Sequence, residues 1–372
     1  MELTFCAPCL FGLEGLAAAQ LRRLGMEQVA AENGRVRFAG DEAALARANI
    51  NLRFAERVLL EVGHFPAPTF DALYEGVKAL ELERFIPRDG QFPVKGHSLD
   101  SALHSIPDCQ RIIKKAAADR LGAKYGCAHM PETGALYQLQ FSIVKDEAYL
   151  YLDTSGAGLH KRGYRPLQHA APLRETLAAA MVELARYRGR GDFCDPFCGS
   201  GTIAIEAALM AKNRAPGLYR SFAAMNWACV PAHVWSEAKD EARSKEFSGD
   251  YHIFASDIDG QAVAQARQNA ERAGVAPLIR FETADATAFS RKTDAGCIVT
   301  NPPYGERLLE KQQAAQLCRA FGQAYAASSG WSAYVLSSLP EFESDFGRRA
   351  DKKRKLYNGM IKCDLYMYFT KP

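Results

Sequence analysis

Four consecutive residues that follow an apolar run, Asn301, Pro302, Pro303 and Tyr304, have the side chains to hold a flat ligand. Proline donates no hydrogen bond to a strand ladder and biases the preceding residue towards extended geometry, so two prolines end a strand and stiffen the chain after it. The stretch is predicted to present the Asn301 amide and the Tyr304 ring at the carboxyl end of a strand, where ligands bind in open α/β sheets. Taken alone, these residues fit a rigid turn with a buried tyrosine equally well.

The ligand that this corner suits is the exocyclic amine of a nucleobase. Such an amine is a poor nucleophile because its lone pair is delocalised into the ring. The Asn301 side-chain carbonyl and a carbonyl of the proline corner can accept its two N–H bonds, which localises the lone pair. Tyr304 offers a face on which an extruded base can stack. Methyl transfer from a sulfonium then needs alignment rather than a strong base, and guanine N2, adenine N6 and cytosine N4 would all fit.

A second stretch, DPFCGSG at 195–201, has the composition of a ligand-binding turn. Gly199 and Gly201 allow close approach of the backbone to a ligand, but neither a Walker A loop nor a G-x-G-x-x-G pattern is present. The acid at Asp195 suits an ammonium group better than a pyrophosphate, which favours S-adenosylmethionine over NAD. Asp257, ending the next strand, is placed for ribose hydroxyls, and Asp285, ending the third, for the adenine amine. Each aspartate could instead cap a helix, but three at successive strand ends favour a binding site.

These side chains need an alternating scaffold, and the sequence from about residue 170 provides one. Strands and helices alternate from DFCDPF to WSAYVLSS, which predicts a parallel, doubly wound α/β sheet. Asn358-Gly359 between two β-rich runs then predicts a C-terminal antiparallel hairpin. Residues up to about 153 are predicted to be α+β, with a hairpin around Lys145-Asp146.

The composition is that of a soluble globular protein, and the cysteine and histidine spacings do not predict a metal site. At 372 residues the chain should form two or three domains, and its 48% hydrophobic and 24% charged content is ordinary. No apolar run reaches the roughly 18 residues that span a bilayer, and the N-terminus has no basic leader. Ten scattered cysteines with a single CxxC, and eight histidines without a ligand spacing, predict reduced thiols in the cytoplasm and no bound metal.

Three basic clusters indicate a polyanionic partner. They lie at 111–124, 160–165 and 348–355, and although each could be a solvated face, their number favours nucleic acid. Arg111 and Lys115 are four residues apart on one helix face, and other bases flank them or lie in the preceding loop. The residues expected to grip RNA phosphates are Lys95, His97, Arg111, Lys114, Lys115, Arg120 and Lys124.

Both motifs resemble the signatures of a known family. DPFCGSGTIAIE at 195–206 and NPPYGER at 301–307 resemble those of THUMP-containing class I RNA methyltransferases, the family of the large-subunit ribosomal-RNA methyltransferase L. The likeness continues through HKRGYR and APLRETLAAAM upstream and KLYNGMIKCDLYMYF downstream. It implies a ferredoxin-like domain at 1–65, a THUMP domain at 66–155 and a Rossmann-like methyltransferase domain at 156–372.

The resemblance also implies site residues. Base-amine chemistry would fall to Asn301, Pro302, Pro303 and Tyr304. Contacts to S-adenosylmethionine would come from Pro172, Leu173, Arg174, Asp195, Cys198, Gly199, Gly201, Thr202, Asp257 and Asp285.

The expected function is a cytoplasmic, S-adenosylmethionine-dependent RNA methyltransferase that acts on guanine N2 of large-subunit ribosomal RNA. Transfer-RNA guanine is the nearest alternative. A DNA adenine N6 methyltransferase would leave the N-terminal half without a role. A non-catalytic RNA-binding protein is the remaining alternative, against which the complete motifs argue. Neither the modified nucleotide nor the oligomeric state follows from the sequence.

Overall fold

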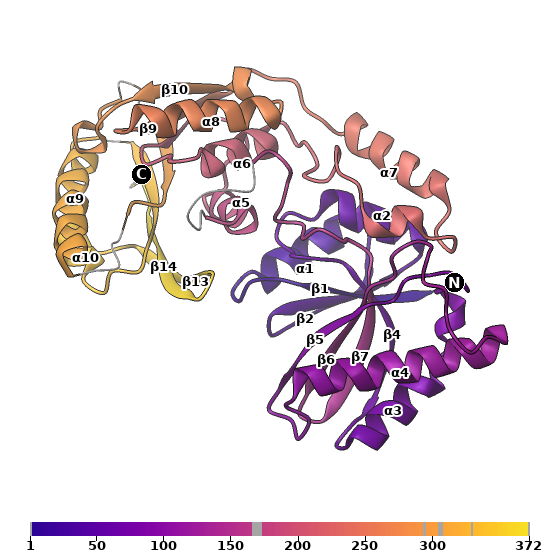
Figure 1. Ribbon diagram of the computed structural model, residues 1–372. Helices are drawn as coiled ribbons and strands as arrows, with labels where there is room; N and C mark the ends of the chain where they lie inside the picture. The colour runs from indigo at the N-terminus through magenta and orange to yellow at the C-terminus, as the bar shows by residue number, and fades with distance from the viewer. Residues whose placement is uncertain are drawn as a thin grey trace. The chain divides into compact units, whose positions relative to one another are not determined.

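The computed structural model describes residues 2–165, 173–291, 293, 295–303, 308–328 and 330–370 (Figure 1). These residues form two compact units. The first unit comprises Met1–Cys9, Ala18–Leu159 and Tyr219–Glu241, and the second comprises Leu10–Ala17, His160–Leu218 and Ala242–Pro372. The first unit is built mainly from the N-terminal half but includes the segment Tyr219–Glu241. The second unit is built mainly from the C-terminal half but includes the segment Leu10–Ala17.

The first unit contains a seven-stranded sheet of order β2-β3-β1-β4-β7-β6-β5. Of its neighbouring pairs, β5 and β6 are parallel and the others are antiparallel. Lys145 and Asp146, with φ of 53° and 62°, form the turn between β6 and β7, which confirms the predicted hairpin. The strands are β1 Leu3–Pro8, β2 Glu27–Glu32, β3 Arg35–Gly40, β4 Leu59–Pro66, β5 Val94–Leu99, β6 Leu139–Val144 and β7 Glu147–Asp153.

Two helices of the N-terminal half have recognisable caps, α2 at its start and α4 at its end. The Asp41 carboxylate accepts a hydrogen bond from the Ala44 amide at 2.8 Å, and Gly126 ends α4 in the left-handed conformation, with φ of 63°. These helices are α1 Glu14–Arg23, α2 Glu42–Asn51, α3 Phe70–Ala79, the 3-10 helix η1 Leu82–Arg84 and α4 Ile106–Tyr125.

A segment from the middle of the chain completes the first unit. It contains the 3-10 helix η2 (Ala223–Asn226) and most of α7 (Ala232–Ser244). The Trp227 indole donates to the Leu136 carbonyl at 2.8 Å and stacks on Tyr137, with ring centroids 5.0 Å apart. The alternation of strands and helices in the sequence does not indicate that this segment belongs to the first unit, because its placement depends on a tertiary contact.

The second unit confirms the predicted doubly wound sheet. Its order is β10-β9-β8-β11-β12-β14-β13, in which the first five strands are parallel and β14 and β13 are antiparallel. The strand order reverses at β8, which lies between β9 and β11. The strands are β8 Asp192–Asp195, β9 His252–Asp257, β10 Ile279–Thr283, β11 Gly296–Thr300, β12 Trp331–Ser337, β13 Lys352–Asn358 and β14 Ile361–Tyr368.

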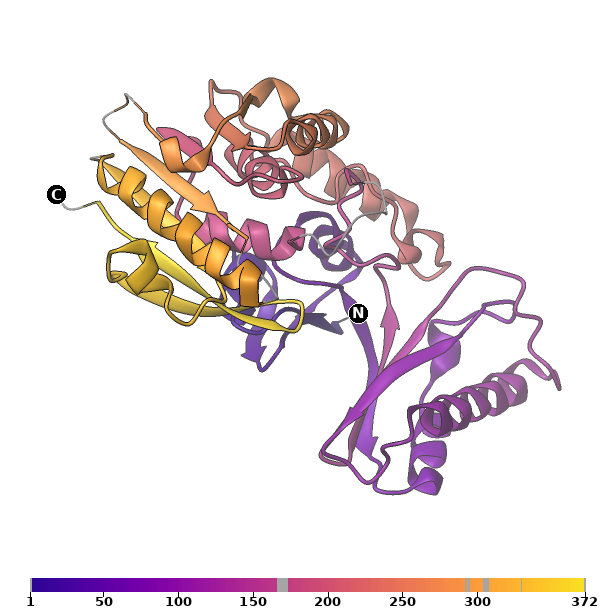
Figure 2. The same ribbon diagram turned by 60° about the vertical axis from the view of Figure 1, so that its left-hand side comes forward.

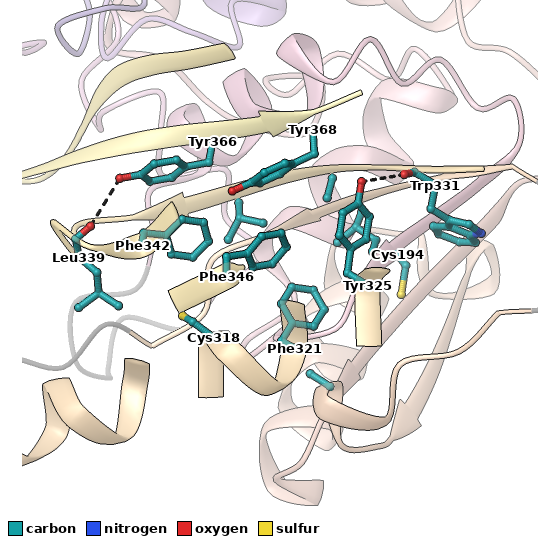
Figure 3. Close-up of a cluster of buried hydrophobic side chains, with 14 of the residues drawn as sticks. Cys194, Cys318, Phe321, Tyr325, Trp331, Leu339, Phe342, Phe346, Tyr366 and Tyr368 are labelled. Carbon is teal, nitrogen blue, oxygen red and sulfur yellow. Dashed lines mark hydrogen bonds between the residues drawn. The ribbon is translucent and has the colours of Figure 1, made fainter. Parts of the chain in front are cut away.

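Aromatic side chains form the hydrophobic core on one face of this sheet. Phe321 and Tyr325 of α9 pack with Phe346 of α10 and with Tyr368 of β14 (Figure 3). The Tyr325 hydroxyl donates to the Trp331 carbonyl at 2.9 Å. This packing holds α9 along the sheet (Figure 2). The remaining helices are α5 Glu175–Leu184, α6 Thr202–Ala211, α8 Gly260–Arg272, η3 Ala276–Leu278, η4 Ala286–Ala288, α9 Leu308–Ala326 and α10 Phe342–Phe346.

No helix in the described part of the chain is long and apolar enough to cross a membrane.

Candidate active site

The predicted site residues converge at the carboxyl edge of the second sheet. Asp195 ends β8, Asp257 ends β9, and Asn301 follows the last residue of β11. Because β8 pairs in parallel with both β9 and β11, these ends lie side by side where the strand order reverses. Ligands bind at such a switch point in doubly wound sheets.

Asp195 is a buried carboxylate with one unused oxygen. Its side chain is 1% exposed, and Oδ1 accepts from the Thr300 hydroxyl at 2.7 Å. Oδ2 has no hydrogen-bond partner among the described residues. Burial raises the pKa of this carboxyl to about 7, against the hydrogen bond from Thr300, which lowers it. A buried acceptor of this kind is suited to a donor that arrives with a ligand.

The glycine turn is fixed to the end of β9. The Gly199 amide donates to Asp257 Oδ2 at 2.9 Å, and the Cys198 amide donates to the Ser256 carbonyl at 2.9 Å. Gly199 has φ of 49°, and a Cβ there would meet no atom within 4 Å, so open space lies above the turn. Burial raises the pKa of the Cys198 thiol, so this cysteine is not poised as a nucleophile.

Gly201 has a different role from Gly199. It has φ of 81° at the start of α6, and a Cβ there would lie 2.8 Å from the Ala266 Cβ of α8. Its missing side chain lets α6 approach α8. Asn269, also on α8 and buried, donates to the Ser200 carbonyl at 2.9 Å. The turn is thereby held from both strand and helix.

The third acid, Asp285, is exposed and caps the 3-10 helix η4. Its Oδ1 accepts from the Thr287 amide at 2.8 Å. This is the capping role that the sequence left open as the alternative. Asp257 likewise accepts from the Asp259 amide at 3.1 Å. Since a carboxylate offers about four lone-pair positions, both aspartates retain acceptor capacity for a ligand.

Asn301 resembles Asp195 in having an unused acceptor. Its Oδ1 is buried and has no hydrogen-bond partner in the described part of the chain. Pro302 after it is buried and Pro303 is exposed. Tyr304, and Pro172 of the predicted cofactor contacts, lie outside the described residues.

The basic cluster at 160–165 is largely internal, which corrects its interpretation as a charged surface. The Arg165 guanidinium contacts Glu175 at 2.6 Å, and it also donates to the Leu173 carbonyl and the Thr202 hydroxyl at 3.2 Å each. Arg165 thus ties Leu173, Thr202 and the start of α5, where Arg174 is the N-cap, to the glycine turn.

The other arginine of this cluster is more deeply buried. Arg162 lies 3.4 Å from Glu206 of α6, with side chains 2% and 0% exposed, and the Tyr164 hydroxyl donates to the same carboxylate at 3.1 Å. No local pattern indicates these pairs, because a basic run is usually solvated.

The predicted phosphate contacts on α4 fall into two groups. Arg111, 77% exposed, and Lys115, also exposed, point to solvent, although Arg111 also pairs with Asp108 at 2.8 Å. Lys114 instead binds Glu132 at 2.6 Å, and its ammonium lies 3.5 Å from the Phe92 ring centroid.

The remaining bases show the same division. Arg120 forms a two-point ion pair with Glu83, while Lys124 lies 3.9 Å from the same carboxylate and stays 59% exposed. Lys95 and His97 are exposed on β5. Burial lowers the pKa of His97, whose ring lies 3.1 Å from the Ser142 hydroxyl. His97 is therefore an uncharged contact near neutral pH.

Metal ligands do not cluster in the described ranges: no group of three His, Cys, Asp or Glu side chains could hold an ion there.

Comparison with family profiles divides the chain into three matches. Residues 162–367 match the family described as "RMKL-like, methyltransferase domain". Residues 4–59 match the "RlmL ferredoxin-like domain" and residues 67–153 the "THUMP domain".

Relatives match over the full chain. "Putative RNA methyltransferase YpsC" of Bacillus subtilis is 47% identical over 373 residues, with 100% of this chain and 97% of that protein covered. A crystal structure from Listeria monocytogenes, titled "a predicted N6-adenine-specific DNA methylase", is 46% identical with a TM-score of 0.95, covering 100% and 97% of the two chains. SMU.472, titled "a putative methyltransferase complexed with SAH", is 38% identical with a TM-score of 0.95, covering 100% and 99%.

Proposed function

The chain belongs to the RMKL-like methyltransferase family, and from that premise we propose that it methylates guanine N2 in large-subunit ribosomal RNA. The observation that carries a base-amine reaction is the buried, unpartnered Asn301 Oδ1 beside the Asp195–Thr300 hydrogen bond. A THUMP domain and a relative named as an RNA methyltransferase support RNA as the substrate.

S-adenosylmethionine is the cofactor, as the family and a similar protein complexed with SAH indicate. It supplies an electrophilic methyl group on a sulfonium. The chain fits it in two respects: Asp195 Oδ2 is a buried acceptor suited to an ammonium, and the space above Gly199 admits a ligand close to the backbone. We propose that it is held by Leu173, Arg174, Asp195, Cys198, Gly199, Gly201, Thr202, Asp257 and Asp285, and, from the family resemblance alone, by Pro172.

The part of Asn301 in the reaction is to hold the amine. Leaving a buried acceptor unsatisfied costs about 1–3 kcal/mol, and an N–H of the target base would remove that cost. The second N–H would go to a carbonyl of the corner at Pro302 and Pro303. With both N–H groups held, the nitrogen lone pair is directed out of conjugation, and Tyr304 would stack on the ring. The displaced proton leaves to solvent.

The domain roles follow from the same family. We propose that residues 1–65 and 66–155 select the RNA and that residues 156–372 carry out the transfer. Exposed Lys95, Arg111 and Lys115 would contact phosphates in the first unit. With RNA as the proposed substrate, we propose a cytoplasmic location for the activity.

The substrate is tested by offering labelled S-adenosylmethionine to three separate pools: ribosomal RNA and transfer RNA from cells that lack this protein, and duplex DNA. Nucleoside mass spectrometry then identifies the product. The expected result is N2-methylguanosine in large-subunit ribosomal RNA. Label in transfer RNA would change the partner and keep the chemistry, whereas N6-methyladenine in DNA would overturn the proposal.

The role of Asn301 is tested by two substitutions. Asn301→Ala removes the acceptor and is expected to abolish turnover while leaving affinity for S-adenosylhomocysteine within about twofold, because the cofactor residues are on other strands. Asn301→Asp keeps an acceptor oxygen at the same place and is expected to retain measurable turnover. Equal loss of turnover and cofactor affinity in Asn301→Ala would mean that the corner is only structural.

A further inference from the structure

The hairpin of β13 and β14 projects past the carboxyl edge of the second sheet. The pairing of β12 with β14 ends at Ser337 opposite Asp364, but β13 and β14 stay paired as far as Asn358 opposite Ile361. Since β14 is antiparallel to β12, residues before Asp364 lie beyond the end of β12. This is the edge at which β11 delivers Asn301, and β14 is two strands from β11, or roughly 10 Å at the usual strand spacing.

The projecting tip is apolar and exposed. Met360 is 99% exposed and Ile361 is 39% exposed. Phe11, which belongs to the same compact unit, is 58% exposed, and its ring meets the Tyr357 ring edge-on with centroids 6.1 Å apart. We call these four residues the edge lip. Ile361, opposite Asn358, lies on the other face of the hairpin from Tyr357, so the lip exposes apolar side chains on both sides of the tip. Exposed large apolar side chains at one place mark an interaction site.

The loop that carries Phe11 is built to lie on β13. Gly12 has φ of 88°, and a Cβ there would be 2.8 Å from the Lys355 carbonyl oxygen, so only glycine allows this approach. The Arg354 guanidinium donates to the Gly12 carbonyl at 2.6 Å. Phe11 is therefore held beside Tyr357 by main-chain geometry rather than by chance.

The charge around the lip is positive. Lys362 lies directly opposite Tyr357, and Lys355 is two residues before it, so the three side chains share one face of the hairpin. Both lysines are exposed, and the partly exposed Asp364, directly opposite Lys355, is the acid on the same face. Exposed apolar side chains beside two exposed lysines suit nucleic acid, whose bases stack and whose phosphates are anionic.

We propose that the edge lip binds the nucleotides that flank the target base in RNA. This inference rests on the proposed function, because a base must leave its stack to reach Asn301. Its neighbour then loses a stacking partner, and an apolar side chain such as Met360 or Phe11 can take the vacated place. Lys355 and Lys362 hold the adjoining phosphates.

The test compares four variants in RNA binding and turnover, with ribosomal RNA from cells lacking this protein as the probe. Phe11→Ala and Met360→Ala are each expected to weaken RNA binding about tenfold, the effect of losing one stacked base. Phe247→Ala is the matched control, because Phe247 is equally exposed, at 59%, but lies outside the lip. Lys362→Ala should lower the slope of log affinity against log salt by about 1.

The fold of each variant is checked by thermal unfolding, and its cofactor site by its affinity for S-adenosylhomocysteine. Both measurements are expected to match those of the unsubstituted protein. The inference is overturned if the lip variants bind and methylate RNA normally, or if Phe247→Ala loses as much RNA affinity as Phe11→Ala. Neither result would overturn the proposed function. If the unsubstituted protein methylates no RNA but the lip variants alone lose RNA affinity, the proposed function falls and the lip is an RNA-binding surface without a target base. An unsubstituted protein that binds no RNA would overturn the lip.

Discussion

At the scale of single residues, Asp195 and Asn301 share an uncommon property. Each is placed at a strand end with a buried oxygen that no group of the described chain satisfies. Folding normally pairs such atoms, because an unsatisfied buried acceptor costs about 1–3 kcal/mol. Two of them at one sheet edge are best explained by ligands that bring the missing donors: an ammonium for Asp195 and a base amine for Asn301.

Cofactor affinity should therefore depend on the ionisation of Asp195. The carboxyl has a pKa of about 7 in the ligand-free protein, so it is charged above pH 7 and protonated below. Affinity for S-adenosylhomocysteine, measured by calorimetry from pH 8 to pH 6, should fall as pH drops through 7, by up to about tenfold per pH unit. Asp195→Asn should bind weakly with no such dependence. The same pH dependence in both proteins would assign the titration to another group.

At the scale of elements, the glycine turn is positioned by contacts on two sides. Hydrogen bonds join it to the end of β9, and the close approach of α6 to α8 at Gly201 sets its angle. The buried pair of Arg162 and Glu206 adds a third attachment, since breaking a buried ion pair leaves a charge without a partner. The turn is thus a rigid part of the fold.

Alanine substitutions at three glycines with positive φ distinguish the cost of backbone strain from the cost of a packing clash. Gly191→Ala adds only strain, about 1–2 kcal/mol, because no atom lies within 4 Å of its Cβ position. Gly201→Ala adds a clash with Ala266 and should lower the free energy of unfolding further. Gly199→Ala should resemble Gly191→Ala in stability yet weaken cofactor binding, because its Cβ enters the ligand space. Chemical denaturation and calorimetry measure both effects, and equal stabilities for Gly191→Ala and Gly201→Ala would contradict the packing role.

At the scale of the whole molecule, each unit has its own charged surface. In the first unit α4 turns Arg111 and Lys115 outward and uses Lys114 and Arg120 in ion pairs with Glu132 and Glu83. In the second unit Lys355 and Lys362 lie on the same face of the hairpin as Tyr357 of the edge lip. Each surface is proposed to contact RNA phosphates, which supply much of the affinity in such complexes.

Two double variants of α4 with the same change in charge test whether its exposed bases, rather than its ion-paired bases, contact RNA. Arg111→Ala with Lys115→Ala should weaken RNA binding and reduce the salt slope by about 2. Lys114→Ala with Arg120→Ala should leave the slope unchanged and lower thermal stability, because Glu132 and Glu83 lose their partners. Filter binding over a range of salt concentrations gives the slopes. Identical slopes for the two double variants would show that exposure does not decide which bases meet RNA.

The sequence alone determined the fold class and the positions of the strand ends. Alternating apolar runs, glycine turns and the Asn358-Gly359 hairpin are local signals, and they predicted the parallel sheet, its antiparallel finish and the placement of Asp195, Asp257 and Asn301 after strands. The family signatures added the cofactor, which the comparisons confirm. Local signals suffice here because turn chemistry and periodicity act within a few residues.

Only the tertiary structure decided what each polar side chain contacts. It buried Arg162 against Glu206, 44 residues along the chain, placed Trp227 on Tyr137 in the first unit, and set Phe11 beside Tyr357 in the second. It also left Asp195 Oδ2 and Asn301 Oδ1 without partners in the described residues. Such pairings join residues that are distant in sequence, and their free energy depends on burial and geometry that exist only after the chain has folded.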